Sequence, residues 1–141
     1  METKNKTLIT VQASINEPIE KVWEYFTLPQ HITQWNQAAD TWHSPKATND
    51  LKVGGKFNYR MEAKDGSFGF DFEGIYDTIK INELIEYTLG DGRKVSLEFT
   101  SNGKETKVVE NFEPENENPH DLQQGGWQAI LNNFKKYVET N

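Results

Sequence analysis

An amphipathic pattern near the C-terminus predicts a helix over residues 126–138. Apolar side chains recur there at intervals of three and four residues, while Gln, Asn and Lys fill the positions between them. The apolar positions are Trp127, Ile130, Leu131, Phe134, Tyr137 and Val138. A single apolar stripe needs an apolar surface to pack against, so this helix must lie on another part of the fold.

The N-terminal part of the chain predicts one strand followed by two short helices. Residues 7–13 show the β-branched alternation that is typical of a strand. Pro18 suits the first turn of a helix, and apolar residues at helical spacing follow it. Pro29 ends that helix and begins a second short one, which we expect to run to Trp35.

The middle of the chain predicts an antiparallel meander of about six strands. Three dipeptides favour tight hairpins, because both central residues of such turns take positive φ. They are Asp65-Gly66, Asp91-Gly92 and Asn102-Gly103. Apolar and polar residues alternate between these turns, so one face of the sheet is aromatic and the other is hydrated. We therefore expect an α+β fold in which a curved antiparallel sheet of about six or seven strands wraps around the long C-terminal helix.

The aromatic face of the sheet and the apolar face of the final helix enclose either a solid core or a ligand cavity. Ligand pockets are mostly apolar with a few convergent polar groups, and we expect such a cavity here. The side chains expected to line it are Trp35, Trp42, Phe57, Tyr59, Met61, Phe70, Phe72, Tyr87, Leu97, Phe99, Glu110, Trp127, Ile130, Leu131 and Phe134. The alternative is that the same residues simply fill the core.

Glu110 is the one carboxylate that the alternation directs inward. It shares its parity with Val108 and Phe112, and burial without a partner should raise the pKa of its carboxyl. Such a group is suited to orienting a ligand hydroxyl or amine, or to acting as a base. The alternative is a β-bulge or an edge position that turns Val109 inward instead.

Composition narrows the possible partners. The 141 residues predict one domain spanning 1–141, and the net charge of −7 disfavours nucleic acid and anionic membranes. There is no cysteine, which removes thiol chemistry and fits a reducing compartment. The first residues are polar and no apolar run approaches the roughly 18 residues of a membrane span, so we expect a cytoplasmic protein.

No motif predicts a catalytic residue, a metal site or a cofactor. His31, His43 and His120 lack the spacing of metal ligands. Asp71 and Glu73 share a parity opposite to the aromatic face, so we expect both to face water. A Gly-x-Ser-x-Gly nucleophile elbow is absent from the sequence.

Five segments together resemble homologues of the C-terminal domain of the Hsp90 ATPase activator, within the START/Bet v 1-like helix-grip superfamily. They are residues 16–23, 49–57, 72–76, 84–87 and the Gly126-Trp127 pair that opens the last helix. The resemblance implies a helix-grip fold with a cavity used across the superfamily for lipids, sterols, polyketides and other apolar ligands. It implies neither a catalytic triad nor a cofactor. The eukaryotic activator carries a further N-terminal domain that contacts the chaperone, for which this sequence has no room, so ATPase activation is not the favoured expectation.

Three hypotheses about function follow, in order of preference. The first is non-enzymatic binding of a small hydrophobic ligand between the sheet and the final helix. The second is a chaperone-associated domain that binds a protein partner. The third is an enzyme or a sacrificial resistance protein that acts on polyketide-like compounds, with Glu110 as its best candidate residue. The sequence indicates neither the ligand nor the oligomeric state.

Overall fold

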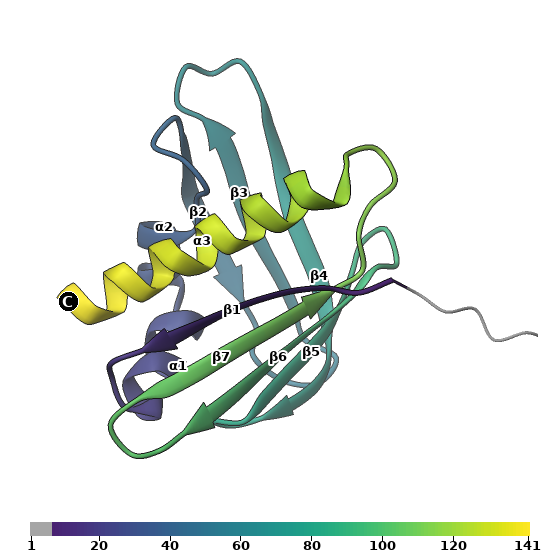
Figure 1. Cartoon of the computed structure of the whole chain (residues 1–141). Coiled ribbons are helices and arrows are strands. Elements are labelled where there is room, and N and C mark those ends of the chain that lie inside the picture. The colour runs from purple at the N-terminus through teal and green to yellow at the C-terminus, as the bar shows by residue number, and fades with distance from the viewer. Residues whose placement is uncertain (1–6) are drawn as a thin grey trace, which may run out of the picture.

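A computed structural model, which describes residues 7–141, shows a seven-stranded antiparallel sheet curled around one long helix (Figure 1). The strands lie in the order β1-β7-β6-β5-β4-β3-β2, and two short helices follow β1. The expected α+β helix-grip fold is therefore confirmed. The elements are β1 (Ile9–Ile15), α1 (Ile19–Thr27), α2 (Pro29–Trp35), β2 (Trp42–Asn49), β3 (Lys56–Ala63), β4 (Gly69–Lys80), β5 (Leu84–Leu89), β6 (Lys94–Ser101), β7 (Thr106–Phe112) and α3 (His120–Thr140).

The three predicted hairpin turns are present, but their backbone differs from the expected type. Only the glycine of each dipeptide has positive φ, at 79° for Gly66, 94° for Gly92 and 100° for Gly103. The preceding Asp or Asn instead accepts a hydrogen bond from a backbone N–H two residues further on. These side chains stabilise the turns, so the first central residue does not need the left-handed conformation.

Helix α3 is longer than the apolar stripe predicted, because it begins at His120 instead of residue 126. Pro119 immediately precedes its first turn, where the missing N–H of proline is tolerated. The added turns carry mainly exposed polar residues, which give no periodic apolar signal. Gln123 is the exception, since it is buried against the β7–α3 connection.

Two glutamines on α3 hold it against the outer edge of β1. Gln124 donates from Nε2 to the carbonyl oxygen of Thr10, at 3.1 Å. Gln128 bonds both backbone groups of Gln12, donating to its oxygen at 3.0 Å and accepting from its nitrogen at 3.3 Å. Residues four apart on a helix lie on one face, and they match residues two apart on a strand. These contacts also cover part of an edge strand that would otherwise present free backbone groups.

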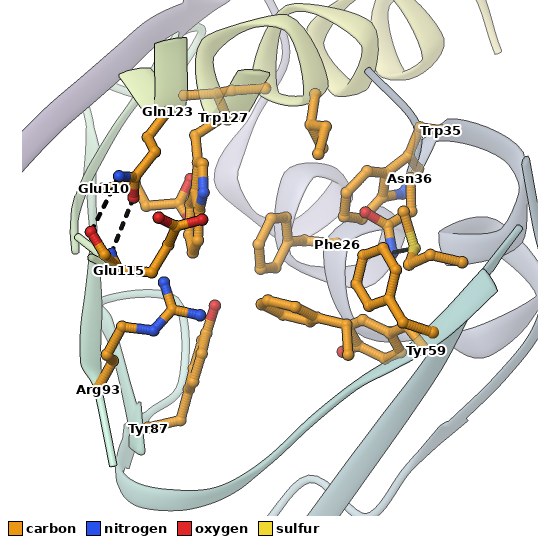
Figure 2. A pocket seen from close by; sticks show the side chains of 15 residues that line it. Phe26, Trp35, Asn36, Tyr59, Tyr87, Arg93, Glu110, Glu115, Gln123 and Trp127 are labelled. Carbon is orange, nitrogen blue, oxygen red and sulfur yellow. Dashed lines mark hydrogen bonds between the residues drawn. The ribbon is translucent and has the colours of Figure 1, made fainter. Parts of the chain in front are cut away.

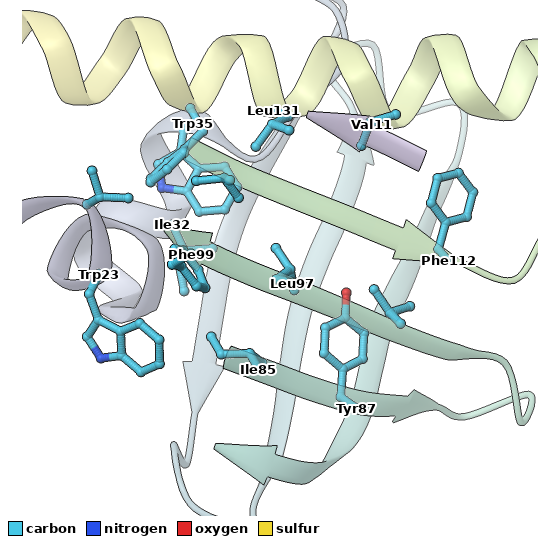
Figure 3. Close-up of a cluster of buried hydrophobic side chains, with 14 of the residues drawn as sticks. Val11, Trp23, Ile32, Trp35, Ile85, Tyr87, Leu97, Phe99, Phe112 and Leu131 are labelled. Carbon is cyan, nitrogen blue, oxygen red and sulfur yellow. The ribbon is translucent and has the colours of Figure 1, made fainter. Parts of the chain in front are cut away.

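The C-terminal half of α3 lies on a solid core (Figure 3). Phe134 is fully buried, with its ring centroid 5.1 Å from that of Phe26 and 4.8 Å from that of Trp35. Phe99 on β6 extends this cluster to Phe26 and to Trp23, at centroid distances of 5.8 and 5.3 Å. The space between sheet and helix is therefore filled by side chains at this end.

Two glycines in different settings give opposite predictions for the free energy of unfolding. A Cβ on Gly74 would lie 2.7 Å from the carbonyl oxygen of Thr88 and 2.9 Å from the ring of Phe57, so we expect Gly74→Ala to destabilise by about 1–3 kcal/mol. Gly125 lies within α3 with open space around its Cβ position. We expect Gly125→Ala to stabilise by about 0.5–1 kcal/mol through helix propensity. Urea denaturation of both variants would measure the two changes, and equal changes of the same sign would contradict this account of the packing.

Candidate functional site

A cavity of about 330 Å³ lies beneath the N-terminal half of α3 (Figure 2). Its wall is built from α1, α2, α3, strands β3, β4, β5 and β7, and the segments that follow α2, β5 and β7. The lining residues are Phe26, Trp35, Asn36, Tyr59, Met61, Phe70, Phe72, Tyr87, Arg93, Glu110, Glu115, Gln123, Trp127, Ile130 and Leu131. The space between sheet and helix is thus hollow at one end and solid at the other.

Most of the residues expected at a cavity are in its wall. These are Trp35, Tyr59, Met61, Phe70, Phe72, Tyr87, Glu110, Trp127, Ile130 and Leu131. They come from segments far apart in the sequence, and the curl of the sheet brings them to one space (Figure 1). Alternation along each strand identified the inward side of these positions.

The other expected residues do not line this cavity. Phe99 and Phe134 belong to the solid core beneath the other half of α3, and Leu97 is fully buried two residues before Phe99 on β6. Phe57 contacts a second space of about 30 Å³, and Trp42 packs against Phe68 and Phe70 at the far end of the β3–β4 hairpin. Parity gives the face on which a side chain lies, but it does not give the position along the strand at which the core becomes hollow.

Several lining residues were not expected from the sequence. They are Phe26, Asn36, Arg93, Glu115 and Gln123. Phe26 had the helical spacing of a core residue, and this spacing was its only signal. The others lie after an element ends or in its first polar turn, where periodicity does not apply. Arg93 had the clearest signal in the sequence, because it is a cation directly after the hairpin turn predicted at Asp91-Gly92.

Seven of the fifteen residues that line the cavity are aromatic. Trp127 stacks on Phe112, with ring centroids 3.9 Å apart and planes 9° apart. Phe72 meets the edge of Trp127 at 6.0 Å and stacks near Tyr59 at 6.3 Å. Rings in these arrangements present flat apolar faces that suit a planar ligand.

Glu110 points inward, as its parity indicates. It is 9% exposed, and its neighbours of the same parity, Val108 and Phe112, are fully buried. The register of β7 is unbroken against both β1 and β6, so the alternative of a bulge that turns Val109 inward does not occur. Burial raises the pKa of the Glu110 carboxyl to about 8. Within residues 7–141 this carboxyl makes no hydrogen bond and no ion pair.

Tyr87 and Arg93 accompany Glu110 at one end of the cavity (Figure 2). Burial, and then the nearby charge of Glu110, hold the pKa of the Tyr87 hydroxyl well above its usual range. The Nε of Arg93 donates to Asp91 at 2.7 Å. This end of the cavity is therefore polar, and the rest of the wall is mainly apolar.

Gln123 and Glu115 hold the segment that closes this end. Gln123 donates to the carbonyl oxygens of Glu115 and Asn118, and it accepts from the Glu115 nitrogen at 2.9 Å. The Glu115 carboxylate accepts from the backbone of Glu117 and from Asn118. Both side chains are thus engaged in fixing the connection between β7 and α3.

The histidines have separate surroundings. His31 stacks on Tyr25 at 4.0 Å and bonds the Tyr137 hydroxyl at 2.8 Å, whereas His43 lies 3.8 Å from a Glu62 carboxylate oxygen. In the part of the chain that the structure describes, no group of three or more His, Cys, Asp or Glu side chains is placed to hold a metal ion. No helix in that part is long and apolar enough to cross a membrane. Asp71 and Glu73 are exposed, as their parity indicates.

Comparisons with known proteins agree with this architecture. The solution structure of an AHSA1-like protein from Aeromonas hydrophila is 41% identical, with a TM-score of 0.89, and the match covers 95% of this chain and 93% of that one. A protein from Cytophaga hutchinsonii is 57% identical, with a TM-score of 0.82 and coverage of 98% and 94%. DynU16, a protein in the dynemicin biosynthetic locus, shares the fold at 16% identity and a TM-score of 0.71, with coverage of 96% and 48%.

The family assignment rests on sequence as well as on structure. No curated protein gave a match to the chain. Residues 16–139 match the family described as "Activator of Hsp90 ATPase homolog 1-like protein". This match spans nearly all the residues from the end of β1 to the end of α3. The chain therefore belongs to the family of activator of Hsp90 ATPase homolog 1-like proteins.

Proposed function

We propose that this protein binds a small hydrophobic, ring-containing ligand in the cavity beneath the N-terminal half of α3. The observation that carries the proposal is the contrast between the two halves of this helix. Phe134 and Val138 in one half are fully buried in the solid core, while Trp127 and Ile130 in the other half border about 330 Å³ of space. Aromatic side chains fill the space beneath the C-terminal half of α3, whereas the space beneath its N-terminal half remains open.

The size and chemistry of the cavity fit this function. Small-molecule sites have volumes of about 300–1,000 Å³ and mainly apolar walls with a few polar groups. An engineered apolar cavity of about 150 Å³ in another protein holds benzene. The present cavity has roughly twice that volume, so a compound of roughly two to three rings fits between its aromatic walls.

The burial of Glu110 supports a binding site over a simple packing defect. An inward carboxyl without a partner lowers stability, and an apolar residue at this position would avoid that penalty. Groups held at such a cost are typical of functional sites. Glu110 is therefore better explained as a ligand contact than as part of the core.

A second candidate function, binding of a chaperone, is favoured by an exposed aromatic cluster at the end of the β3–β4 hairpin. Trp42, Phe68 and Phe70 form this cluster, and Phe68 and Phe70 are 61% and 40% exposed. Exposed neighbouring rings often mark a protein interaction site. The family description, which refers to an activator of the Hsp90 ATPase, suggests the class of partner.

The main proposal predicts saturable binding of the neutral fluorescent probe N-phenyl-1-naphthylamine. Probe fluorescence should rise on addition of the protein, because the ring enters an apolar environment. Ile130→Trp places a larger side chain in the cavity and should weaken binding by at least about tenfold. Leu122→Trp is the matched control, because Leu122 lies exposed on the same helix. Equal binding by the two variants would place the probe elsewhere.

Glu110 also predicts how stability depends on pH. The pKa of its carboxyl is about 8 in the folded state against a reference value of 4.5, so the folded protein binds the proton more tightly than the unfolded chain. The wild type should therefore lose stability relative to Glu110→Gln as pH rises from about 4.5 to 8, and the difference should be constant above that range. The advantage of the variant should reach a few kcal/mol, at about 1.4 kcal/mol per pH unit.

Urea denaturation at pH 5, 7 and 9 would measure this difference. Glu98→Gln is the matched control, since it removes the same charge from an exposed position on β6. A gain that is independent of pH, or equal in both variants, would show that the Glu110 carboxyl is not desolvated in the folded protein.

The partner hypothesis predicts that the aromatic cluster mediates binding to a purified Hsp90-type chaperone. Phe68→Ser should reduce this binding, because Phe68 is the most exposed ring of the cluster. Ile81→Ser is the control, as Ile81 is 70% exposed in a different turn. Surface plasmon resonance would measure both variants, and absence of binding by the wild type would exclude the hypothesis for that chaperone.

A further inference from the structure

Three polar groups that have no hydrogen-bond partner within residues 7–141 meet at one end of the cavity. They are the Glu110 carboxyl, the Tyr87 hydroxyl and the terminal nitrogens of Arg93 (Figure 2). Arg93 uses only its Nε, in the bond to Asp91, so its two terminal nitrogens are unoccupied among the described residues. Tyr87 is close enough to both other groups for their charges to act on its hydroxyl.

The remaining polar groups at this end are already engaged. Gln123 uses both atoms of its amide on the backbone of the β7–α3 connection, and Glu115 uses both carboxylate oxygens on the same segment. The cavity wall therefore contains both polar groups that fix the structure and polar groups that remain available. Only the available set can serve a ligand without disturbing the fold.

The opposite end of the cavity does not offer a comparable set. The Asn36 amide donates to the Met61 sulfur at 3.4 Å, and burial and the neighbouring Tyr76 hold the pKa of the Tyr59 hydroxyl well above its usual range. Tyr76 in turn donates to Asn49 at 2.6 Å. A ligand with one polar group is therefore oriented with that group towards Glu110 and its rings towards Tyr59 and Phe72.

We propose that the ligand is an aromatic acid whose carboxylate is held by Arg93, Tyr87 and Glu110. This inference rests on the proposed function, since it specifies the polar group of a ligand bound in the same cavity. Arg93 supplies a guanidinium whose terminal N–H groups match the geometry of a carboxylate. Tyr87 and the protonated form of Glu110 each donate one further hydrogen bond.

The protonated carboxyl of Glu110 is a hydrogen-bond donor near neutral pH. With a pKa of about 8, its carboxyl is mainly protonated at pH 7. A bound carboxylate raises that pKa further, because two adjacent carboxylates cannot both remain ionised. A ligand amine would need the ionised form of Glu110 and would face the Arg93 cation, so the charges at this end disfavour it.

The other charged groups around this end of the cavity do not occupy the place proposed for the ligand carboxylate. Asp91 and Glu115 are the carboxylates near Arg93, and both are committed to hydrogen bonds in their own turns. The strand neighbours of Glu110 are Val11 on β1 and Leu97 on β6, and α3 contributes Trp127 and Leu131 to this wall. Directed donors, rather than a net positive charge, thus hold the carboxylate.

Three naphthalene probes of similar shape test the inference by isothermal titration calorimetry. They are naphthalene-2-carboxylate, 2-naphthalenemethanol and 2-naphthalenemethylamine, which place an anion, a neutral group and a cation on the same ring system. At pH 6 we expect the carboxylate to bind at least about tenfold more tightly than the alcohol. The amine should bind more weakly than the alcohol.

Raising the pH should remove most of this preference. At pH 9.5 Glu110 is ionised in the ligand-free protein and opposes binding of the carboxylate, while Tyr87 remains a donor because burial keeps its pKa high. We expect the affinity of the wild type for the carboxylate to fall by about fivefold or more between pH 6 and 9.5. Glu110→Gln keeps a donor without the ionisation and should keep its affinity at both values.

Arg93→Met should weaken binding of the carboxylate by at least about tenfold and so remove its preference over the alcohol. Arg60→Met is the matched control, because Arg60 pairs with Glu62 and Asp71 away from the cavity. Equal affinity of the wild type for the carboxylate and the alcohol at pH 6, or preference for the amine, would overturn the inference of an aromatic acid but not the proposed function. Failure of all three probes and of N-phenyl-1-naphthylamine to bind would overturn the proposed function itself.

Discussion

The placement of α3 over the sheet is the constraint on which the rest of the structure depends. Gln124 and Gln128 bond the outer edge of β1 and fix the helix along that strand. Trp127 stacks on Phe112 and acts as a spacer between helix and sheet. Because both contacts lie at the N-terminal half of α3, that half cannot collapse onto the curved sheet. The same contacts that fasten the helix therefore keep the cavity open.

Close packing in the solid half of the molecule offsets the stability that is lost where the other half is hollow. Apolar side chains that border the hollow half bury less surface than those of a solid core and so contribute less to the free energy of unfolding. Phe134, Phe26 and Trp35 pack closely at the other end of the helix, so stable packing is concentrated there. This division gives the protein a rigid frame on one side and room for a ligand on the other.

The sequence predicted the elements and faces of the fold better than the extent of the cavity. Alternation placed Phe72, Tyr87 and Glu110 on the inner face because the period of a strand is independent of its neighbours. It did not separate Phe72, which borders the cavity, from Phe99, which fills the core, since both have inward parity. That difference depends on how far the sheet curls and where α3 crosses it. The polar start of α3 was also missed, because Gln124 binds the backbone of β1, Gln123 binds the β7–α3 connection, and neither forms an apolar pattern.

The polar residues within the inner face distinguish a binding site from a packing defect. A defect in an apolar core needs no carboxyl, and replacing Glu110 by an apolar residue would remove a desolvated group from the fold. Arg93 approaches the same end from the β5–β6 turn, while Gln123 fixes the loop that closes it. Strand β7, strand β5 and the β5–β6 turn thus bring Glu110, Tyr87 and Arg93 to one end of an otherwise apolar space. Packing alone provides no reason for this convergence, whereas a ligand with a ring system and one polar end requires it.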